Sequence, residues 1–211
     1  MPYAVKEIFY TLQGEGRNSG RAAVFCRFAG CNLWTGREAD RASAICAFCD
    51  TDFVGTNGGG GGRFASARDL ASAVEQTWRG GVVSQRLVIL TGGEPLLQVD
   101  EELITTLHEA SFEVAVETNG TIQPPAGIDW LCVSPKAGAP LVVTAGDELK
   151  LVYPQIGAEP TQFENLAFKH LLLQPMDDAE REANTAAAVA YCLANPSWRL
   201  TLQTHKFLGI P

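Results

Sequence analysis

The sequence contains no apolar run that approaches the ~20 residues needed for a membrane-spanning helix. Residues 1–16 also lack the basic-then-apolar layout of a secretory signal. Positive charge is scarce, because 16 Lys and Arg stand against 24 Asp and Glu and leave a formal net charge of −8. A surface that binds nucleic acid usually needs a basic face. We therefore predict a cytoplasmic protein that contacts neither a membrane nor nucleic acid.

Disulfides are not expected despite six cysteines, because the chain is long, carries no signal and has an ordinary core composition. Hydrophobic residues make up 46% and charged residues 19% of the 211 positions, which is typical of a globular protein. This length suits one domain over residues 1–211. The one low-complexity tract, 57–62 (NGGGGG), matches no phosphate-binding loop and is interpreted as a flexible connection.

Strand-like and helix-like segments alternate after residue 62. Short, apolar, β-branched segments predict strands at 22–29, 86–91, 113–117, 130–134, 148–153, 168–173 and 199–204. Helices are predicted at 66–79 with Ser66 as the N-cap, at 99–110, and at 177–194 from Asp177. This order predicts an α/β fold with a parallel sheet. The helices are too few for a closed barrel, so we expect a partial, open parallel β/α barrel with reduced helix content; a doubly wound sheet is the alternative.

Polar residues follow the ends of five predicted strands. They occur at 91–94 (TGGE), 117–119 (ETN), 134–136 (SPK), 174 (Q) and 203–205 (QTH). Sites in parallel α/β folds form at the carboxyl ends of the strands. We therefore predict a single site at this edge of the sheet.

Four cysteines are spaced as Cys26-x4-Cys31-x14-Cys46-x2-Cys49. This spacing is close to that of a four-cysteine zinc ribbon, whereas the last three alone would suit an iron–sulfur cluster with one iron that lacks a protein ligand. Cys26 alternates with apolar neighbours on one face of its predicted strand, which is typical of a small buried hydrophobic residue. These residues favour the cluster, but they leave open a zinc site completed by a distant histidine and also the absence of a metal.

Three cysteines that end in Cys-x2-Cys, followed by a strand and by GGEP at 92–95, resemble the radical S-adenosylmethionine (SAM) superfamily. The gap between the first two cysteines departs from the short gap usual in that superfamily. Together with TLQGEG at 11–16, this wide gap is similar to one branch, the 7-carboxy-7-deazaguanine synthases. The match extends from Tyr10 to the C-terminus and includes FCRFAGCNLW, CDTDF, LTGGEP, VETNG, VSPK, LLLQPMD and THKFLGIP.

The resemblance implies three groups of ligand-binding residues. Within a cluster-binding loop at 30–53, a 4Fe–4S cluster would be held by Cys31, Cys46 and Cys49, and Mg²⁺ by Thr51. The residues expected to contact SAM are Phe48, Asp50, Gly93, Glu94, Glu117, Asn119, Ser134, Pro135, Lys136, Gln174, Pro175, Met176 and Asp177. The residues expected to contact a pterin substrate are Leu12, Gln13, Gly14, Glu15, Arg27, Thr91, His205 and Pro211.

Two of these residues also have ordinary structural interpretations. Arg27, in mid-strand, would clamp a substrate carboxylate, or would form a salt bridge to Glu15 or Glu117. Asp177 would contact SAM, cap the helix predicted to begin there, or do both. No side chain is singled out as the catalytic group, because the resemblance assigns the radical chemistry to SAM.

The resemblance implies a ring-contracting lyase. The reduced cluster would cleave SAM, and the resulting radical would start the conversion of 6-carboxy-5,6,7,8-tetrahydropterin to 7-carboxy-7-deazaguanine with loss of ammonia, in queuosine and 7-deazapurine biosynthesis. It also implies a homodimer and a flavodoxin or ferredoxin as electron donor. The alternatives are an activase that installs a glycyl radical on a partner protein, a non-catalytic four-cysteine zinc module, and a simple electron carrier.

Overall fold

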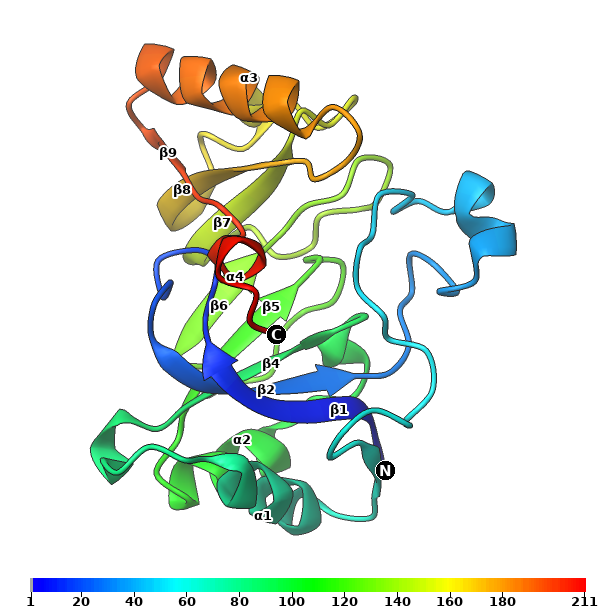
Figure 1. Ribbon diagram of the computed structural model, residues 1–211, viewed down its shortest axis with the longest axis vertical. Helices are drawn as coiled ribbons and strands as arrows, with labels where there is room; N and C mark the ends of the chain where they lie inside the picture. Colours follow the sequence, from blue (N-terminus) through cyan, green and yellow to red (C-terminus); the bar gives the residue numbers. More distant parts are fainter. Residues whose placement is uncertain (1) are drawn as a thin grey trace.

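A mixed sheet forms the centre of the computed structural model, which describes residues 2–211 (Figure 1). Nine strands follow the order β3-β1-β2-β4-β5-β6-β7-β8-β9. The strands from β2 to β9 lie parallel to their neighbours, and β1 lies antiparallel to both β2 and β3. Since β3 and β9 stand at opposite ends of this order, the sheet does not close. The prediction of a partial, open barrel is confirmed.

The strands of the described chain are β1 (Tyr3–Leu12), β2 (Ala22–Phe28), β3 (Gly62–Phe64), β4 (Leu87–Gly92), β5 (Glu113–Thr118), β6 (Trp130–Val133), β7 (Ala145–Tyr153), β8 (Ala167–Pro175) and β9 (Trp198–Leu200). The α-helices are α1 (Ala67–Thr77), α2 (Glu101–Glu109), α3 (Arg181–Ala194) and α4 (Thr204–Leu208). Within residues 2–211, no helix has the length and apolar character needed to cross a membrane.

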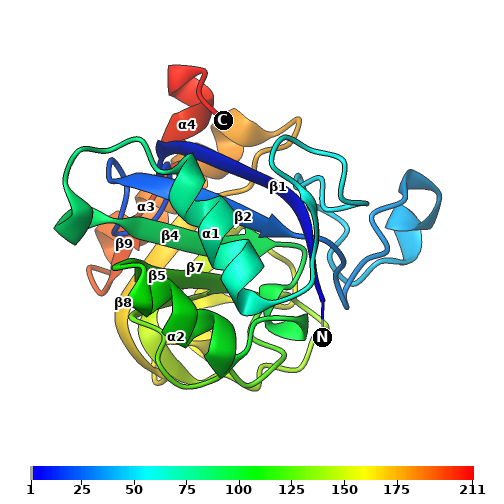
Figure 2. The ribbon, with the colours of Figure 1, turned by 90° about the horizontal axis from the view of Figure 1, so that it is seen from below.

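Two apolar cores hold the sheet and its helices together. Helices α1 and α2 lie side by side against the first half of the sheet (Figure 2), where Leu70 and Leu103 pack with strand residues such as Val88. Helix α3 covers β8 and β9, and its Ala188 packs with Trp198. Each buried Leu or Val side chain contributes roughly 1.5–3 kcal/mol through removal from water. Polar side chains lie instead at the rim formed by the carboxyl ends of the parallel strands.

The helix starts follow from the residues before them. Ser66 caps α1, as predicted, and forms a full capping box with Asp69. Helix α3 begins at Arg181, so the predicted start at Asp177 is wrong and Asp177 is not an N-cap. The reason is local: the Asp178 carboxylate accepts a hydrogen bond from the Glu180 amide and turns the chain before the helix begins.

Three other predictions of secondary structure need correction. Strands β1 and β3 were not predicted, and the predicted strand at 199–204 is a strand only over Trp198–Leu200. The chain leaves the sheet after β9 because the amide of Thr204 donates to the carbonyl of Gly14 on a distant loop. Residues 203–204 therefore contact that loop and do not extend the sheet.

The glycine tract 57–62 is packed, so its interpretation as a flexible connection is wrong. The amide of Gly58 donates to the carbonyl of Lys6, and the amide of Ile8 donates to the carbonyl of Gly59. A Cβ atom at Gly61 would overlap the backbone of Lys6. At Gly58, Gly60 and Gly61 the tract lies directly against β1, which leaves no room for a side chain at these three positions.

Candidate active site

A cavity of about 310 Å³ lies at the carboxyl ends of the parallel strands. Its walls come from the ends of β4, β5 and β8, from residues after β6 and β9, from the loop after β1, and from the segment 46–53. The prediction that the strand-end polar residues meet at one site is confirmed. Every residue predicted to contact cluster, magnesium, SAM or substrate lines this cavity, except Glu94 and Pro135. The individual roles of these residues stay predictions.

The three thiols of Cys31, Cys46 and Cys49 share one wall of the cavity. A hydrogen bond from Cys46 lowers the pKa of Cys49, which favours the thiolate form of this side chain. The same bond, together with burial, raises the pKa of Cys46. Within residues 2–211, no three His, Cys, Asp or Glu side chains surround a single-ion site. Three thiols with no fourth protein ligand fit a cluster that keeps one iron open better than they fit one zinc ion.

Cys26 stands apart from these thiols. It is fully buried in the core between sheet and helices and does not line the cavity. Burial raises the pKa of its thiol well above the ordinary value. The prediction that Cys26 is a small hydrophobic residue is confirmed, and the four-cysteine zinc arrangement does not form.

The segment between Cys31 and Cys46 is fixed to the rest of the loop 30–53 by an arginine. Arg41 lies with its guanidinium carbon 4.1 Å from the centre of the Trp34 ring and pairs with Glu38. It donates to the backbone carbonyls of Ala47 and Cys49, at 2.8 and 3.0 Å. The long gap that distinguishes this sequence thus supplies an arginine that connects it to the backbone between Cys46 and Cys49.

Glu94 lies behind the cavity wall with no exposed surface. Its carboxylate accepts hydrogen bonds from the Leu96 and Asn119 amides and from the Thr118 hydroxyl. Burial raises the pKa of Glu94, and the bonds from Asn119 and Leu96 oppose that rise. Glu94 therefore fixes the end of β5, where Asn119 lines the cavity.

The wall predicted to contact SAM contains a buried polar atom that has no partner among the described residues. Gln174, at the end of β8, is 6% exposed, and its side-chain oxygen Oε1 accepts no hydrogen bond. Such an atom costs free energy unless a ligand supplies a donor. Gln174 lines the cavity, so the site is suited to a ligand that carries hydrogen-bond donors.

Lys136 brings a half-buried positive charge to the same cavity. Its ammonium donates to the hydroxyl and the carbonyl of Ser134 and lies 5.9 Å from the centre of the Phe48 ring. Burial lowers the pKa of Lys136, and the nearby thiols of Cys46 and Cys49 oppose this effect. Lys136 thus provides a cation beside the thiols.

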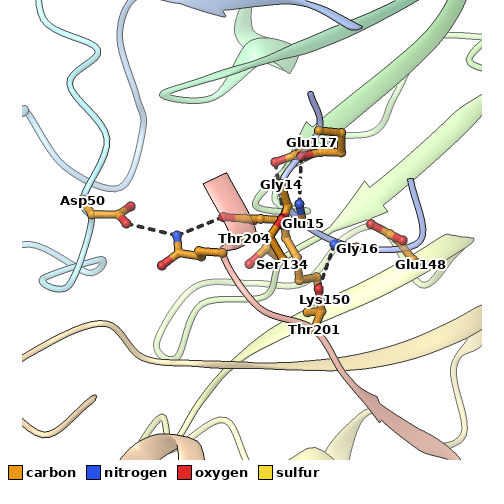
Figure 3. Close-up of polar contacts among 12 residues, drawn as sticks. Gly14, Glu15, Gly16, Asp50, Glu117, Ser134, Glu148, Lys150, Thr201 and Thr204 are labelled. Carbon is orange, nitrogen blue, oxygen red and sulfur yellow. Dashed lines mark hydrogen bonds and ion pairs between the residues drawn. The ribbon is translucent and has the colours of Figure 1, made fainter. Parts of the chain in front are cut away.

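Sequence reasoning missed the two other lysines of the site. Lys150 on β7 forms ion pairs with Glu15 and Glu117 (Figure 3). Lys206 on α4 forms ion pairs with Asp50 and Asp177. Each lysine joins segments far apart in the sequence; Lys206 lies within the motif THKFLGIP, but that motif does not indicate its ion pairs.

Arg27 lines the cavity, but its salt bridge differs from both predicted ones. Its Nε donates to Glu7, 2.7 Å away on the neighbouring strand β1. The two residues are directly opposite in the antiparallel register. Glu15 and Glu117 are instead paired with Lys150. Since Nε is used for Glu7, the two terminal nitrogens of Arg27 are the ones left to receive an anion from the cavity.

Comparison with known proteins gives a consistent result. No protein-family model matches the sequence. The chain is 64% identical to the 7-carboxy-7-deazaguanine synthases of Caulobacter vibrioides and of Bordetella pertussis, in each case over 211 residues that cover all of both chains. A protein of the same name from Bacteroides thetaiotaomicron is 41% identical over 98% of this chain and 97% of its own. The solved structure of QueE from Escherichia coli matches with a TM-score of 0.71 at 26% identity, over 96% of this chain and 94% of that one.

Proposed function

Because the chain belongs to the 7-carboxy-7-deazaguanine synthase family, we propose that the cavity at the strand ends is where it carries out its reaction. The protein is a radical SAM lyase that converts 6-carboxy-5,6,7,8-tetrahydropterin to 7-carboxy-7-deazaguanine with loss of ammonia. The observation that carries the assignment to this cavity is the meeting of Cys31, Cys46 and Cys49 with the loop Leu12–Glu15 around one space.

The donor set fits the cofactors of the family. Cys31, Cys46 and Cys49 would hold a 4Fe–4S cluster, which together with SAM supplies the electron and the radical that begin the reaction. SAM would lie against Phe48, Ser134, Lys136 and the segment Gln174–Asp177. Two observations support this placement: the Oε1 atom of Gln174 is buried without a partner among residues 2–211, and Lys136 is a half-buried cation beside the thiols.

The substrate would lie against the opposite wall. The terminal nitrogens of Arg27 would bind the substrate carboxylate in a charge-assisted pair, while Glu7 keeps the guanidinium oriented through Nε. The loop Leu12–Glu15, with Thr91, His205 and Pro211, would contact the polar edge of the ring. Since these groups only bind and orient the pterin, their contribution is to hold the reacting carbon in place and exclude water.

Three further features of the family complete the proposal. Thr51 would help to hold Mg²⁺, which would supply positive charge for the substrate carboxylate, since Thr51 lines the cavity near Cys49 and a hydroxyl is a hard oxygen ligand. The protein would act in the cytoplasm as a homodimer. A flavodoxin or ferredoxin would deliver the electron.

The test is anaerobic reconstitution with iron and sulfide, followed by electron paramagnetic resonance with and without SAM. A reduced four-iron signal that shifts when SAM is added is expected, because three cysteines leave one iron open. Formation of 7-carboxy-7-deazaguanine from free pterin, with no partner protein present, separates this enzyme from a glycyl-radical activase. Omitting Mg²⁺, and replacing Thr51 with Ala, should both lower the rate. A signal that does not respond to SAM would refute the proposal.

A further inference from the structure

Lys150 occupies a position between the two halves of the cavity. Its side chain is 5% exposed on β7, in the interior of the sheet. The ammonium lies 2.5 Å from Glu15, on the loop after β1, and 3.3 Å from Glu117, at the end of β5 (Figure 3). Glu15 belongs to the wall assigned to the substrate, and Glu117 to the wall assigned to SAM.

Lys150 keeps its charge because of its two carboxylate partners. Burial would lower the pKa of Lys150, but the carboxylates of Glu117 and Glu15 raise it well above the ordinary value. Burial would likewise raise the pKa of Glu15, but the Lys150 ammonium lowers it. One ammonium therefore serves two carboxylates, and its removal would leave two like charges close together in a buried place.

The rest of the loop is held by hydrogen bonds whose donors are uncharged amides. The Gly16 amide donates to the Thr201 hydroxyl at 2.8 Å, and the Arg17 amide donates to the Glu148 carboxylate at 2.9 Å. On the other side, the Gln13 side-chain amide donates to Glu117 at 2.8 Å. Glu117 thus accepts hydrogen bonds from both Gln13 and Lys150. The Glu15–Lys150–Glu117 triad is therefore the charged connection between this loop and β5.

We propose that Lys150 is a positioning residue that fixes the pterin-binding loop Gln13–Glu15 against the end of β5. The inference rests on the proposed function, since it takes that loop to bind the substrate. Lys150 acts by neutralising Glu15 and Glu117 together, so that the loop approaches the strand without charge repulsion. Its contribution is to hold the loop in place.

The experiment compares Lys150→Met with wild type in the reconstituted holoenzyme. The matched control is Lys169→Met, because Lys169 on the neighbouring strand β8 is 72% exposed and pairs with Asp147 away from the cavity. Three quantities are measured: the KM for the pterin, the Kd for SAM, and hydrogen–deuterium exchange of residues 12–18. Lys150→Met is expected to raise the pterin KM at least tenfold and to speed exchange in the loop, with the SAM Kd within threefold. The control should match wild type in all three.

An unchanged pterin KM or unchanged loop exchange would overturn the proposal, as would an equal weakening of pterin and SAM. If Lys150→Met fails to fold, Glu15→Gln is compared with Glu15→Gln plus Lys150→Met, since the neutral amide removes the charge conflict. The second change should then leave loop exchange and the pterin KM close to those of Glu15→Gln; faster exchange or a further tenfold rise in the KM would show that Lys150 acts in some way other than by neutralising the pair, and would also overturn the proposal. Loop exchange is independent of turnover, so a wild-type protein that makes no product would refute the proposed function and leave this inference to be judged by exchange alone.

Discussion

Replacing Glu94 with Gln tests how the buried wall of the site is held. The two carboxylate oxygens of Glu94 accept three hydrogen bonds, from Leu96 N at 3.0 Å, Thr118 Oγ1 at 2.8 Å and Asn119 N at 2.8 Å. Glutamine is nearly isosteric, but it offers one oxygen and one NH₂ group. It can keep the bonds to Leu96 and Thr118, and its NH₂ group then faces the Asn119 amide, which is also a donor.

The expected loss of stability follows from this one clash between two hydrogen-bond donors. One buried backbone N–H loses its acceptor, and an unsatisfied buried group costs about 1–3 kcal/mol. We therefore expect the free energy of unfolding to fall by about this amount. In a domain of this size each kcal/mol lowers Tm by about 2–4 °C. Because Asn119 lines the cavity, the Kd of the holoenzyme for SAM should also rise.

Urea unfolding at neutral pH, followed by circular dichroism, measures the free energy. Glu159→Gln is the control, since Glu159 is exposed and its side chain makes no capping bond. A loss below about 0.5 kcal/mol for Glu94→Gln, within the range of ordinary surface substitutions, would refute the reasoning. It would mean that Glu94 is protonated and donates to one of its partners, so that an amide replaces it without conflict.

Three other predictions follow from the cysteines, the acidic groups and the glycine tract. Cys26→Ala should keep the full iron and sulfide content of the reconstituted protein, whereas Cys31→Ala should lose most of it. Iron and sulfide assays measure both contents. Loss of iron in Cys26→Ala would contradict the assignment of the cluster ligands. The pKa of Glu15 is lowered in the folded protein from its ordinary value of 4.5, so its contribution to stability is present above that pH and is lost as the pH falls below it. Urea unfolding of wild type and Glu15→Gln between about pH 5 and pH 3 should therefore show a shallower acid loss in the variant; parallel curves would argue against the ion pair. Gly61→Ala should destabilise the protein by about 1–3 kcal/mol, because its Cβ would meet the Lys6 backbone, while Gly59→Ala, which meets nothing within 4 Å, should not; equal effects on Tm would contradict the packed tract.

The fold was predictable where its signals are local. Buried parallel strands such as β4 and β5 are short apolar runs, and Ser66 marks the start of α1 by its own side chain. Strand β1 was missed because it contains Lys6 and Glu7 in its middle. Their partners are Asp52 and Arg27, which only the folded chain brings close.

The site, like the fold, was predictable where a local signal in the sequence marks its residues. Residues at strand ends are visible in the sequence, because each follows an apolar run, and they do meet at one cavity. Lys150 carries no such mark, because it lies within a strand and its partners are 135 and 33 residues away. The balance of charge in the site depends on these long-range pairs, and no spacing within a segment encodes them.

The bonds that join the loop after β1 to the chain after β9 also set when the site can form during synthesis. Gly16 and Thr201 are 185 residues apart, and Gly14 and Thr204 are 190 apart. Domains fold as the chain leaves the ribosome, and contacts of such separation form last. A nascent chain that has not yet reached Thr201 already contains every residue of the core under α1 and α2, yet the loop after β1, proposed to bind the pterin, lacks these partners. The reactive thiols are therefore translated long before the loop opposite them can be completed, and cluster insertion into a finished site has to wait for the end of translation.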